Sequence, residues 1–351
     1  MHGGSRGGVT GVRCSDYHVP MAPKEPVRML DVAQEAGVSR ATVSLVLRGE
    51  GVIGQETRDH VVSVAKRLGY VYDRRAAQLR SGASNVVGLI ITDSRNPFFM
   101  EFTDAIEGPL AAEEKVLLVA FTHDDVESQR RILRRFIEDR VKDIILVPAI
   151  GTTAAELQEL KTVANVVLAT RPVRGSGLPC VASDATFGSR TGAEHLLWHG
   201  AKRLAFYGGI SDSPTRRQRA AGFAAAVAEA GAELVAPWNV ASHPSAEQVF
   251  GQVKDLIRLG EVPDAIACNS DPIAFGVMRA LADSGVAIGE EVRVIGFDDL
   301  AYSSLWRPSL TSLRVEPKVL GELTAGAILR PRRGGHLHKP TLVTRESCGC
   351  R

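Results

Sequence analysis

Residues 37–47 read GVSRATVSLVL, and the apolar side chains of this stretch follow the spacing of a helix. At about 100° per residue, Val43, Val46 and Leu47 share one side, which is enough to seat a short helix on its neighbours. Ser39 is a good N-cap before this helix, and Gly49 is a good stop after it. The other side mixes arginine and hydroxyl groups with small or apolar ones, and it lacks the Glu and Lys typical of a helix that faces only water. The stretch therefore predicts a helix with one face free for a partner.

Two further helical patterns flank this stretch. LDVAQEAG before it ends at Gly37, and residues 55–68 after it place Val61, Val62, Ala65 and Leu68 on one side and end at Gly69. Two helices joined by a short turn that contains Gly, followed by a third, form the helix-turn-helix arrangement, whose second helix enters the DNA major groove. A three-helix bundle without a ligand is the alternative that this pattern leaves open.

The second of these helices carries side chains suited to DNA. Arg40 is long enough to reach a guanine edge, and Ala41 and Leu45 can contact thymine methyl groups. Short hydroxyl donors suited to phosphate oxygens complete this face: Ser39, Thr42 and Ser44. Residues 27–82 hold nine basic and six acidic side chains, and this modest positive excess is compatible with a polyanionic partner.

The segment YVYDRRAAQLRSG at 70–82 is too polar to form a core. Such a segment is normally a flexible spacer. It could instead fold on DNA, with Leu79 inserted between base pairs in the minor groove while Arg74 and the neighbouring arginines neutralise phosphates.

The 351 residues suggest more than one domain, and no apolar run is long enough to predict a membrane span. The Gly-rich residues 1–26 lack the apolar region of a signal peptide, so we expect a disordered tail; translation could also start at Met21. Five cysteines without an export signal favour free thiols in a reducing cytoplasm. The final CGC has no matching ligands elsewhere in the pattern, and we expect neither a metal site nor a cofactor.

From residue 84 onward, buried β-type runs alternate with amphipathic helices, which predicts two doubly wound lobes with parallel sheets. Ligands in such folds bind beyond the carboxyl ends of the strands. Candidates there are Phe98 as a stacking surface, Arg219 as a bidentate donor and Asp271 as an acceptor. The alternatives are that Phe99 belongs to the core and that Asp271 caps the helix begun by Pro272.

The chain resembles the lactose- and galactose-repressor family of bacterial transcription regulators. The resemblance rests on the following segments, in order: MLDVAQEAGVSRATVSLVLRG, TRDHVVSVAKRLGYVYDRRAAQLRSG, NPFFMEFTDAIE, GAEHLLWHGAKRLAFYGG, RRQRAAGF, PDAIACNSDPIAFGVMRAL, VRVIGFDD and LTSLRVEP. It implies that Arg40, Ala41 and Leu45 read bases, that Leu79 intercalates, and that Arg219 and Asp271 bind an effector.

The resemblance also implies an α/β fold class, with a three-helix helix-turn-helix domain before a two-lobed body like a periplasmic binding protein. Three crossings between the lobes are expected near 183–185, 310–312 and 339–341. The expected parts are a tail over 1–26, a DNA-binding domain over 27–73, a hinge over 74–83, a first lobe over 84–183 plus 311–340, and a second lobe over 184–310 plus 341–351.

Two rival functions can be weighed against a regulator. We find no Walker, GxSxG, HExxH or strand-linked GxGxxG motif that would favour an enzyme. An exported solute-binding protein would have a similar body, but the 27–82 module and the missing signal peptide disfavour it. We therefore expect a cytoplasmic, nucleoid-associated repressor, not an enzyme, that binds a pseudo-palindromic double-stranded operator as a homodimer. We expect its effector to be a sugar, although purine effectors occur in the family and induction and co-repression both stay open.

Overall fold

The computed structural model describes residues 27–72, 85–243, 245–331 and 334–350. The chain divides into two units, residues 1–83 and 84–351, and each is described by itself. We call the described part of the first unit (27–72) the N-terminal module and that of the second unit the body. The predicted hinge contacts of Arg74 and Leu79 lie outside the described residues.

The N-terminal module contains the three predicted helices, α1 (Met29–Glu35), α2 (Arg40–Arg48) and α3 (Gln55–Leu68). Gly49 and Gly69 end α2 and α3 with positive φ angles of 72° and 71°, the left-handed conformation that glycine tolerates best. Val43 and Val46 of α2 are buried in the small core, as their spacing predicted. On α3, Val61 and Ala65 are buried as predicted and Val64 is buried as well, whereas the predicted Val62 is 47% exposed.

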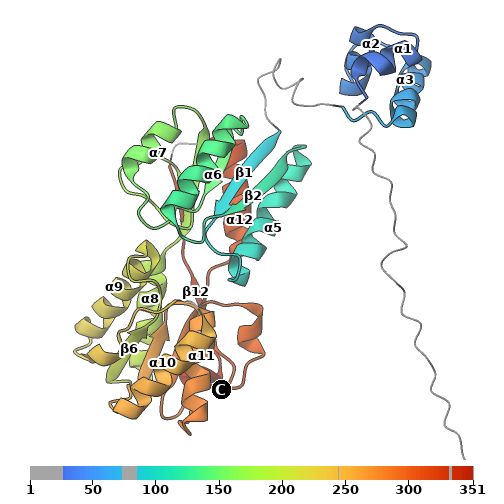
Figure 1. Ribbon diagram of the computed structural model, residues 1–351. Coiled ribbons are helices and arrows are strands. Elements are labelled where there is room, and N and C mark those ends of the chain that lie inside the picture. The colour runs from blue at the N-terminus through green and yellow to red at the C-terminus, as the bar shows by residue number, and fades with distance from the viewer. Residues whose placement is uncertain (1–26, 73–84, 244, 332–333, 351) are drawn as a thin grey trace, which may run out of the picture. The chain divides into compact units, whose positions relative to one another are not determined.

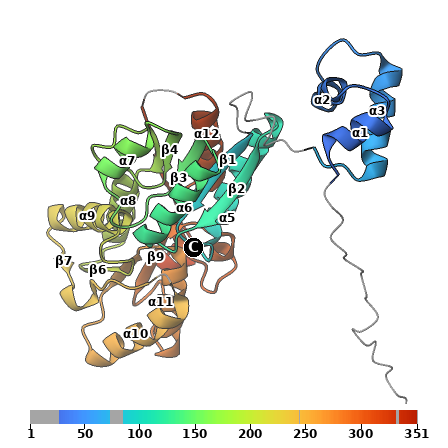
Figure 2. The same cartoon turned by 45° about the horizontal axis from the view of Figure 1, so that its top comes forward.

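The first lobe of the body is built on a six-stranded parallel sheet in the order β11-β5-β4-β3-β1-β2. Its strands are β1 (Val86–Ile91), β2 (Val116–Phe121), β3 (Asp143–Leu146), β4 (Asn165–Ala169), β5 (Cys180–Ser183) and β11 (His336–His338). One face packs on α5 (Pro97–Ala112) and α12 (Pro317–Leu329), and the other on α6 (Val126–Glu138) and α7 (Ala154–Leu160) (Figure 2). Because both faces are covered, the central strands are continuous apolar runs such as VVGLII.

The second lobe repeats this plan with the order β12-β10-β9-β8-β6-β7, in which β12 is antiparallel to β10. Its strands are β6 (Arg203–Tyr207), β7 (Glu233–Leu234), β8 (Ala265–Cys268), β9 (Arg293–Asp298), β10 (Thr311–Arg314) and β12 (Thr341–Val343). The covering helices are α8 (Ala185–Trp198) with α9 (Pro214–Glu229) on one face and α10 (Ala246–Leu259) with α11 (Asp271–Asp283) on the other. Short 3-10 turns complete the lobe: η2 (Ala236–Trp238), η3 (Ala301–Ser304) and η4 (Glu346–Cys348).

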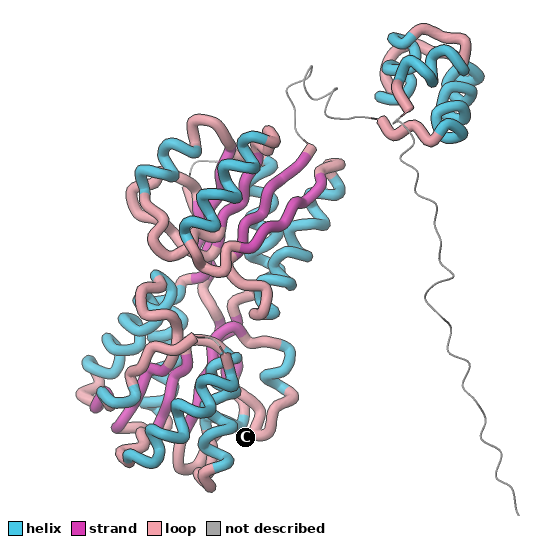
Figure 3. Tube along the Cα trace, in the orientation of Figure 1, coloured by secondary structure: helices cyan, strands magenta, loops and turns pink. Residues whose placement is uncertain are grey.

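The chain passes between the two sheets three times (Figures 1 and 3). The first crossing joins β5 to α8 and the third joins β11 to β12, close to the predicted 183–185 and 339–341. The second was predicted near 310–312, which assigned 311–314 to the first lobe, but it follows β10. Residues 311–314 pair with β9 of the second sheet, and Ser312 donates a hydrogen bond to Asp271 there, so the crossing cannot begin before Arg314.

Candidate functional site

The exposed start of α2 is the candidate DNA-binding surface of the N-terminal module. The Ser39 hydroxyl caps the helix by accepting the Thr42 amide at 3.0 Å, and the two hydroxyl groups hydrogen-bond at 2.9 Å. Arg40 and Ala41 of the first turn are exposed. This cap leaves the predicted base-contacting side chains Arg40 and Ala41 free to meet a groove.

The remaining residues predicted for this surface are less accessible. Leu45 and Thr42 are half-buried, and Ser44 is only 8% exposed. Arg48 donates to the Ser44 carbonyl at 3.2 Å. The geometry therefore supports a contact surface centred on the first turn of α2 and does not support Ser44 as an outward phosphate donor.

A cavity of about 180 Å³ lies between the two lobes of the body, where strands of both sheets end. Its walls hold strand-end residues of the first lobe (Thr92, Asp93, Asp124, Arg171 and Ser183) and of the second lobe (Asn269, Ser270, Asp298 and Val315). This is the position that doubly wound sheets commonly use for a ligand. Its volume is below the roughly 300–1,000 Å³ common for ligand pockets, which favours a small ligand.

Arg219 of α9 is a buried cation in the wall of this cavity. Its guanidinium lies 3.5 Å from the ring centroid of Phe297, a cation–π contact. One terminal nitrogen donates to the Asn269 carbonyl, and the other lies 3.6 Å from the Asp298 carboxylate. These contacts engage both terminal nitrogens and fix the planar guanidinium in one orientation, so a bidentate contact of Arg219 with an effector stays a prediction.

Asp298 ends β9 with a φ of 120°, a strained conformation for a residue other than glycine. Its carboxylate is 7% exposed and accepts a hydrogen bond at 3.1 Å from Asn96, which caps α5 in the first lobe. Burial raises the pKa of Asp298 to about 7, although the charge of Arg219 acts in the opposite direction. One side chain thus bridges the lobes inside the cavity.

Four buried polar atoms of residues that line the cavity have no hydrogen-bond partner among the described residues. They are Arg219 Nε, Asn269 Oδ1, Ser183 Oγ and Ser270 Oγ. A buried polar atom left without a partner costs about 1–3 kcal/mol. Because the set contains donors and acceptors, it suits a small molecule with several hydroxyl groups.

The charged groups of the cavity are arranged in pairs. Arg171 contacts Asp124 at 2.6 Å in the first lobe, and Arg95 contacts Asp93 at 3.0 Å. Arg219 lies beside Asp298 and forms the third pair. Among the described residues, the three arginines of the cavity wall are therefore each matched by a neighbouring carboxyl group.

Phe98 lines the cavity as predicted, but it is 7% exposed and its ring stacks on Phe102 of the core. Its neighbour Phe99, which the sequence left as a core alternative, also lines the cavity. An aromatic wall is thus present, although most of the Phe98 ring surface is already covered.

Asp271 does not line the cavity. Its carboxylate is fully buried and accepts hydrogen bonds from the Leu300 amide at 2.8 Å, from Ser303 at 2.6 Å and from Ser312 at 2.5 Å. Burial raises the pKa of Asp271, whereas these hydrogen bonds lower it. The side chain holds the loop after β9 and the strand β10, so the geometry does not support the prediction that it binds an effector.

Sequence reasoning missed Asp298, which occupies the acidic position in the cavity. The signal was present, because VRVIGFDD is an apolar strand whose carboxyl end carries this residue. The rule that selected Asp271 applies equally to Asp298.

Comparisons with known proteins agree with both halves of the structure. The profile for bacterial regulatory proteins of the lacI family matches residues 28–73, and that for periplasmic binding proteins and the sugar binding domain of the LacI family matches residues 84–337. The HTH-type transcriptional regulator AscG of Escherichia coli is 30% identical over 91% of this chain and 97% of its own length. The HTH-type transcriptional regulator GalS of Salmonella typhimurium is 28% identical over 93% of this chain and 97% of its own.

A solved structure of the lac repressor dimer bound to operator and the anti-inducer ONPF shares the fold, with a TM-score of 0.81. It is 24% identical in sequence, and the match covers 92% of this chain and 99% of that one. In the described part of the protein, no helix combines the length and apolar character needed to cross a bilayer.

Replacing Asp298 by Asn should change how stability depends on pH. The wild-type carboxyl group has a pKa of about 7 in the folded protein and about 3.9 when unfolded, so its contribution to stability is lost as pH rises from about 4 to about 7. Asn cannot ionise, so the variant does not lose this contribution. Relative to wild type, the free energy of unfolding of Asp298→Asn should therefore increase with pH across this range, by up to about 1.4 kcal/mol per pH unit.

The measurement is urea unfolding of the full chain at pH 5 and pH 8. Asp255, which is exposed, supplies the control: Asp255→Asn should keep the wild-type pH dependence. If the free energy of unfolding differs between Asp298→Asn and wild type by the same amount at both pH values, the pKa of the Asp298 carboxyl group is not raised in the folded protein.

Proposed function

Because the chain belongs to the LacI family of bacterial transcription regulators, we propose that it is a cytoplasmic repressor, not an enzyme, controlled by an uncharged sugar in the cavity between its lobes. DNA binding is assigned to the N-terminal module and effector binding to the body. The observation that carries the effector assignment is the set of unpartnered buried polar atoms in the cavity wall.

Operator recognition is proposed to begin at the first turn of α2. The side chain of Arg40 is exposed and makes no hydrogen bond to a described residue, so it can reach a guanine edge in the major groove. The Ser39 cap and the positive end of the helix dipole suit a nearby phosphate. Arg74 and Leu79, outside the described residues, keep their proposed roles as phosphate contact and minor-groove wedge.

Two exposed apolar patches on the body support a homodimer, which a pseudo-palindromic operator would match. In the first lobe, Val116 and Leu118 of the edge strand β2 are 60% and 44% exposed. In the second lobe, Leu305 and Tyr302 are 70% and 62% exposed beside the half-buried Trp306. Apolar side chains gathered in this way commonly mark an interface between proteins.

The choice of an uncharged sugar follows from the charges and size of the cavity. Arg95, Arg171 and Arg219 each have a carboxylate beside them, so a phosphate would have to displace one of these carboxylates. The volume of about 180 Å³ is suited to a monosaccharide better than to a larger sugar. Phe98 offers little free ring surface to a purine, because its ring stacks on Phe102.

Control of DNA binding is proposed to pass through the contact between Asn96 and Asp298. A sugar hydroxyl that binds Asp298 would compete with or reinforce this hydrogen bond between the lobes and so change the angle between them. The first lobe carries the chain toward the hinge, and its movement would alter how the hinges of two subunits meet. Such coupling is reciprocal, so operator and effector must change each other's affinity by one common factor.

A thermal-shift screen of the full chain tests the effector assignment. Unphosphorylated monosaccharides should include a compound that raises the melting temperature, because a ligand at 100 times its dissociation constant stabilises a protein by about 2.7 kcal/mol. Arg219→Gln should abolish the shift, whereas Arg217→Gln, an exposed arginine on the same helix, should retain it. A shift produced by sugar phosphates or nucleobases alone would contradict the proposal.

The role of Arg40 is tested by binding to a library of operator variants. Arg40→Ala should relax the preference at one base position by about 1–3 kcal/mol, because a bidentate contact to one base is lost. The matched control is Lys66→Ala on α3, which removes one exposed positive charge and should leave base preference unchanged. If Arg40→Ala instead lowers the affinity for every operator variant equally, Arg40 contacts a phosphate and not a base.

A further inference from the structure

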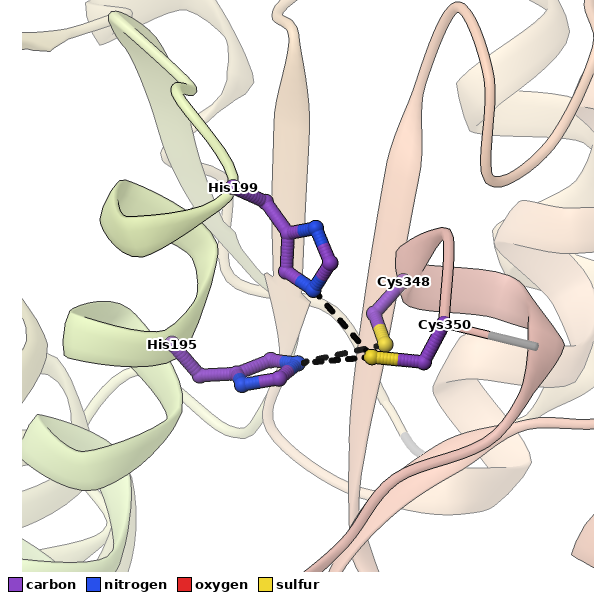
Figure 4. A group of neighbouring side chains, drawn as sticks. All are labelled: His195, His199, Cys348 and Cys350. Atoms are coloured by element: carbon purple, nitrogen blue, oxygen red, sulfur yellow. Dashed lines mark hydrogen bonds between the residues drawn. The ribbon is translucent and has the colours of Figure 1, made fainter.

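Two histidines and two cysteines meet at the end of α8 farthest from the cavity. His195 lies in the last turn of α8, and His199 caps its C-terminus, so their spacing of four residues puts both rings on one side. Cys348 ends η4, and Cys350 follows it near the C-terminus. Figure 4 shows the four side chains converging from these two segments.

The distances within this cluster, which we call the His2Cys2 cluster, are those of metal ligands. His195 Nε2 lies 3.2 Å from Cys348 Sγ and 3.7 Å from Cys350 Sγ, and His199 Nε2 lies 3.2 Å from Cys350 Sγ. All four ligand atoms fall within 4.8 Å of one another. With Zn–S near 2.3 Å and Zn–N near 2.0 Å, a tetrahedral site separates sulfur from nitrogen by roughly 3.6 Å. Small side-chain shifts would therefore bring the four atoms around one ion.

The backbone between the two cysteines is shaped to bring both thiols to this place. Gly349 has a φ of 88°, and a Cβ on it would lie 2.7 Å from the Gly289 carbonyl oxygen. Glycine is therefore required between the cysteines, and its left-handed conformation turns the chain so that both sulfur atoms face α8.

The cysteine segment is held in place by contacts that do not involve the thiols. The Ser347 hydroxyl donates to the Val294 carbonyl at 2.7 Å and accepts from the Thr311 amide at 2.8 Å. The Ser347 amide donates to the Ser309 carbonyl at 2.9 Å. A site formed in this way is preorganised, so little ordering would oppose the binding of an ion.

One neighbouring donor contacts a thiol of the cluster, and a second, buried donor lies beside the glycine between the cysteines. The Thr311 hydroxyl lies 3.1 Å from Cys348 Sγ. Arg293 Nε is buried without a partner among the described residues and lies 3.7 Å from the Cβ position of Gly349. Outer donors of this kind are typical of metal sites with thiolate ligands, whose negative charge they offset.

We propose that His195, His199, Cys348 and Cys350 bind one Zn²⁺ ion as a closed structural site. Thiolate and imidazole ligands are the pair that zinc prefers, and four protein ligands leave no open position for catalysis. The ion would cross-link the C-terminal segment to α8, two segments that lie 151 and 153 residues apart in the chain. Because the first residue of α8 lines the ligand cavity, the cross-link would also hold the helix that forms one cavity wall.

Metal content of the purified full chain tests this proposal. The chain is expressed with Zn²⁺ in the medium, kept in a reductant that does not bind metal, dialysed and analysed by mass spectrometry of elements. We expect one zinc per wild-type chain, and none for His199→Ala or Cys350→Ala. Cys180→Ser and His336→Ala, which alter a cysteine and a histidine outside the cluster, should keep one zinc.

A second measurement on the wild-type chain does not depend on the folding of variants. Co²⁺ added to protein stripped of metal should give the visible absorption of a tetrahedral site and the ultraviolet band of thiolate coordination. Removal of zinc by a chelator should lower the melting temperature of wild type and leave that of Cys350→Ala unchanged.

Three results would overturn the proposal. They are wild-type protein with no more zinc than Cys350→Ala, Co²⁺ spectra without a thiolate band, and a disulfide between Cys348 and Cys350 that persists in reductant. Each of these outcomes leaves the assignments of DNA and sugar binding untouched, because the cluster belongs to neither site.

Discussion

The body depends on one buried carboxylate that both lobes share. Asp298 stands in a strained conformation, beside the guanidinium of Arg219 and within hydrogen-bond distance of Asn96 from the other lobe. A buried charge without partners costs several kcal/mol, so the arrangement of the lobes is tied to how this carboxylate is satisfied. Opening the lobes would separate Asn96 from Asp298, and only water or a ligand could then replace the lost donor.

The energies involved match those needed for regulation. A hydrogen bond to a charged group contributes about 1.5–3 kcal/mol, and allosteric coupling typically amounts to about 1–3 kcal/mol. A single contact between the lobes is therefore large enough to couple ligand and operator, without a rearrangement of either sheet. The paired charges of Arg171 and Arg219 add selectivity, because they favour a ligand that donates and accepts hydrogen bonds but carries no charge of its own.

The spacing of apolar residues predicted the fold well for helices that are buried on one side and for strands that are covered on both faces. The seating of α2 by Val43 and Val46 and the two alternating lobes follow directly from the positions of apolar residues. The same reasoning selected Asp271 and missed Asp298, although each lies at the carboxyl end of a buried strand, because only tertiary contacts show that the Asp271 carboxylate is already used. Sequence spacing also identified no further metal ligands for the cysteines of the final CGC. His195 lies 153 residues from Cys348 in the chain, so no local motif connects the two residues.

Coupling through the shared carboxylate is measured by the dissociation constant of the effector, determined by calorimetry with and without a saturating operator fragment, for wild type and for Asn96→Ala. Operator should change the effector affinity of the wild-type chain by about 5- to 150-fold, and Asn96→Ala should reduce this factor markedly. The exposed Asn239→Ala in the second lobe should retain the wild-type factor. An equal factor for wild type and Asn96→Ala would contradict the claim that the shared carboxylate couples the two sites.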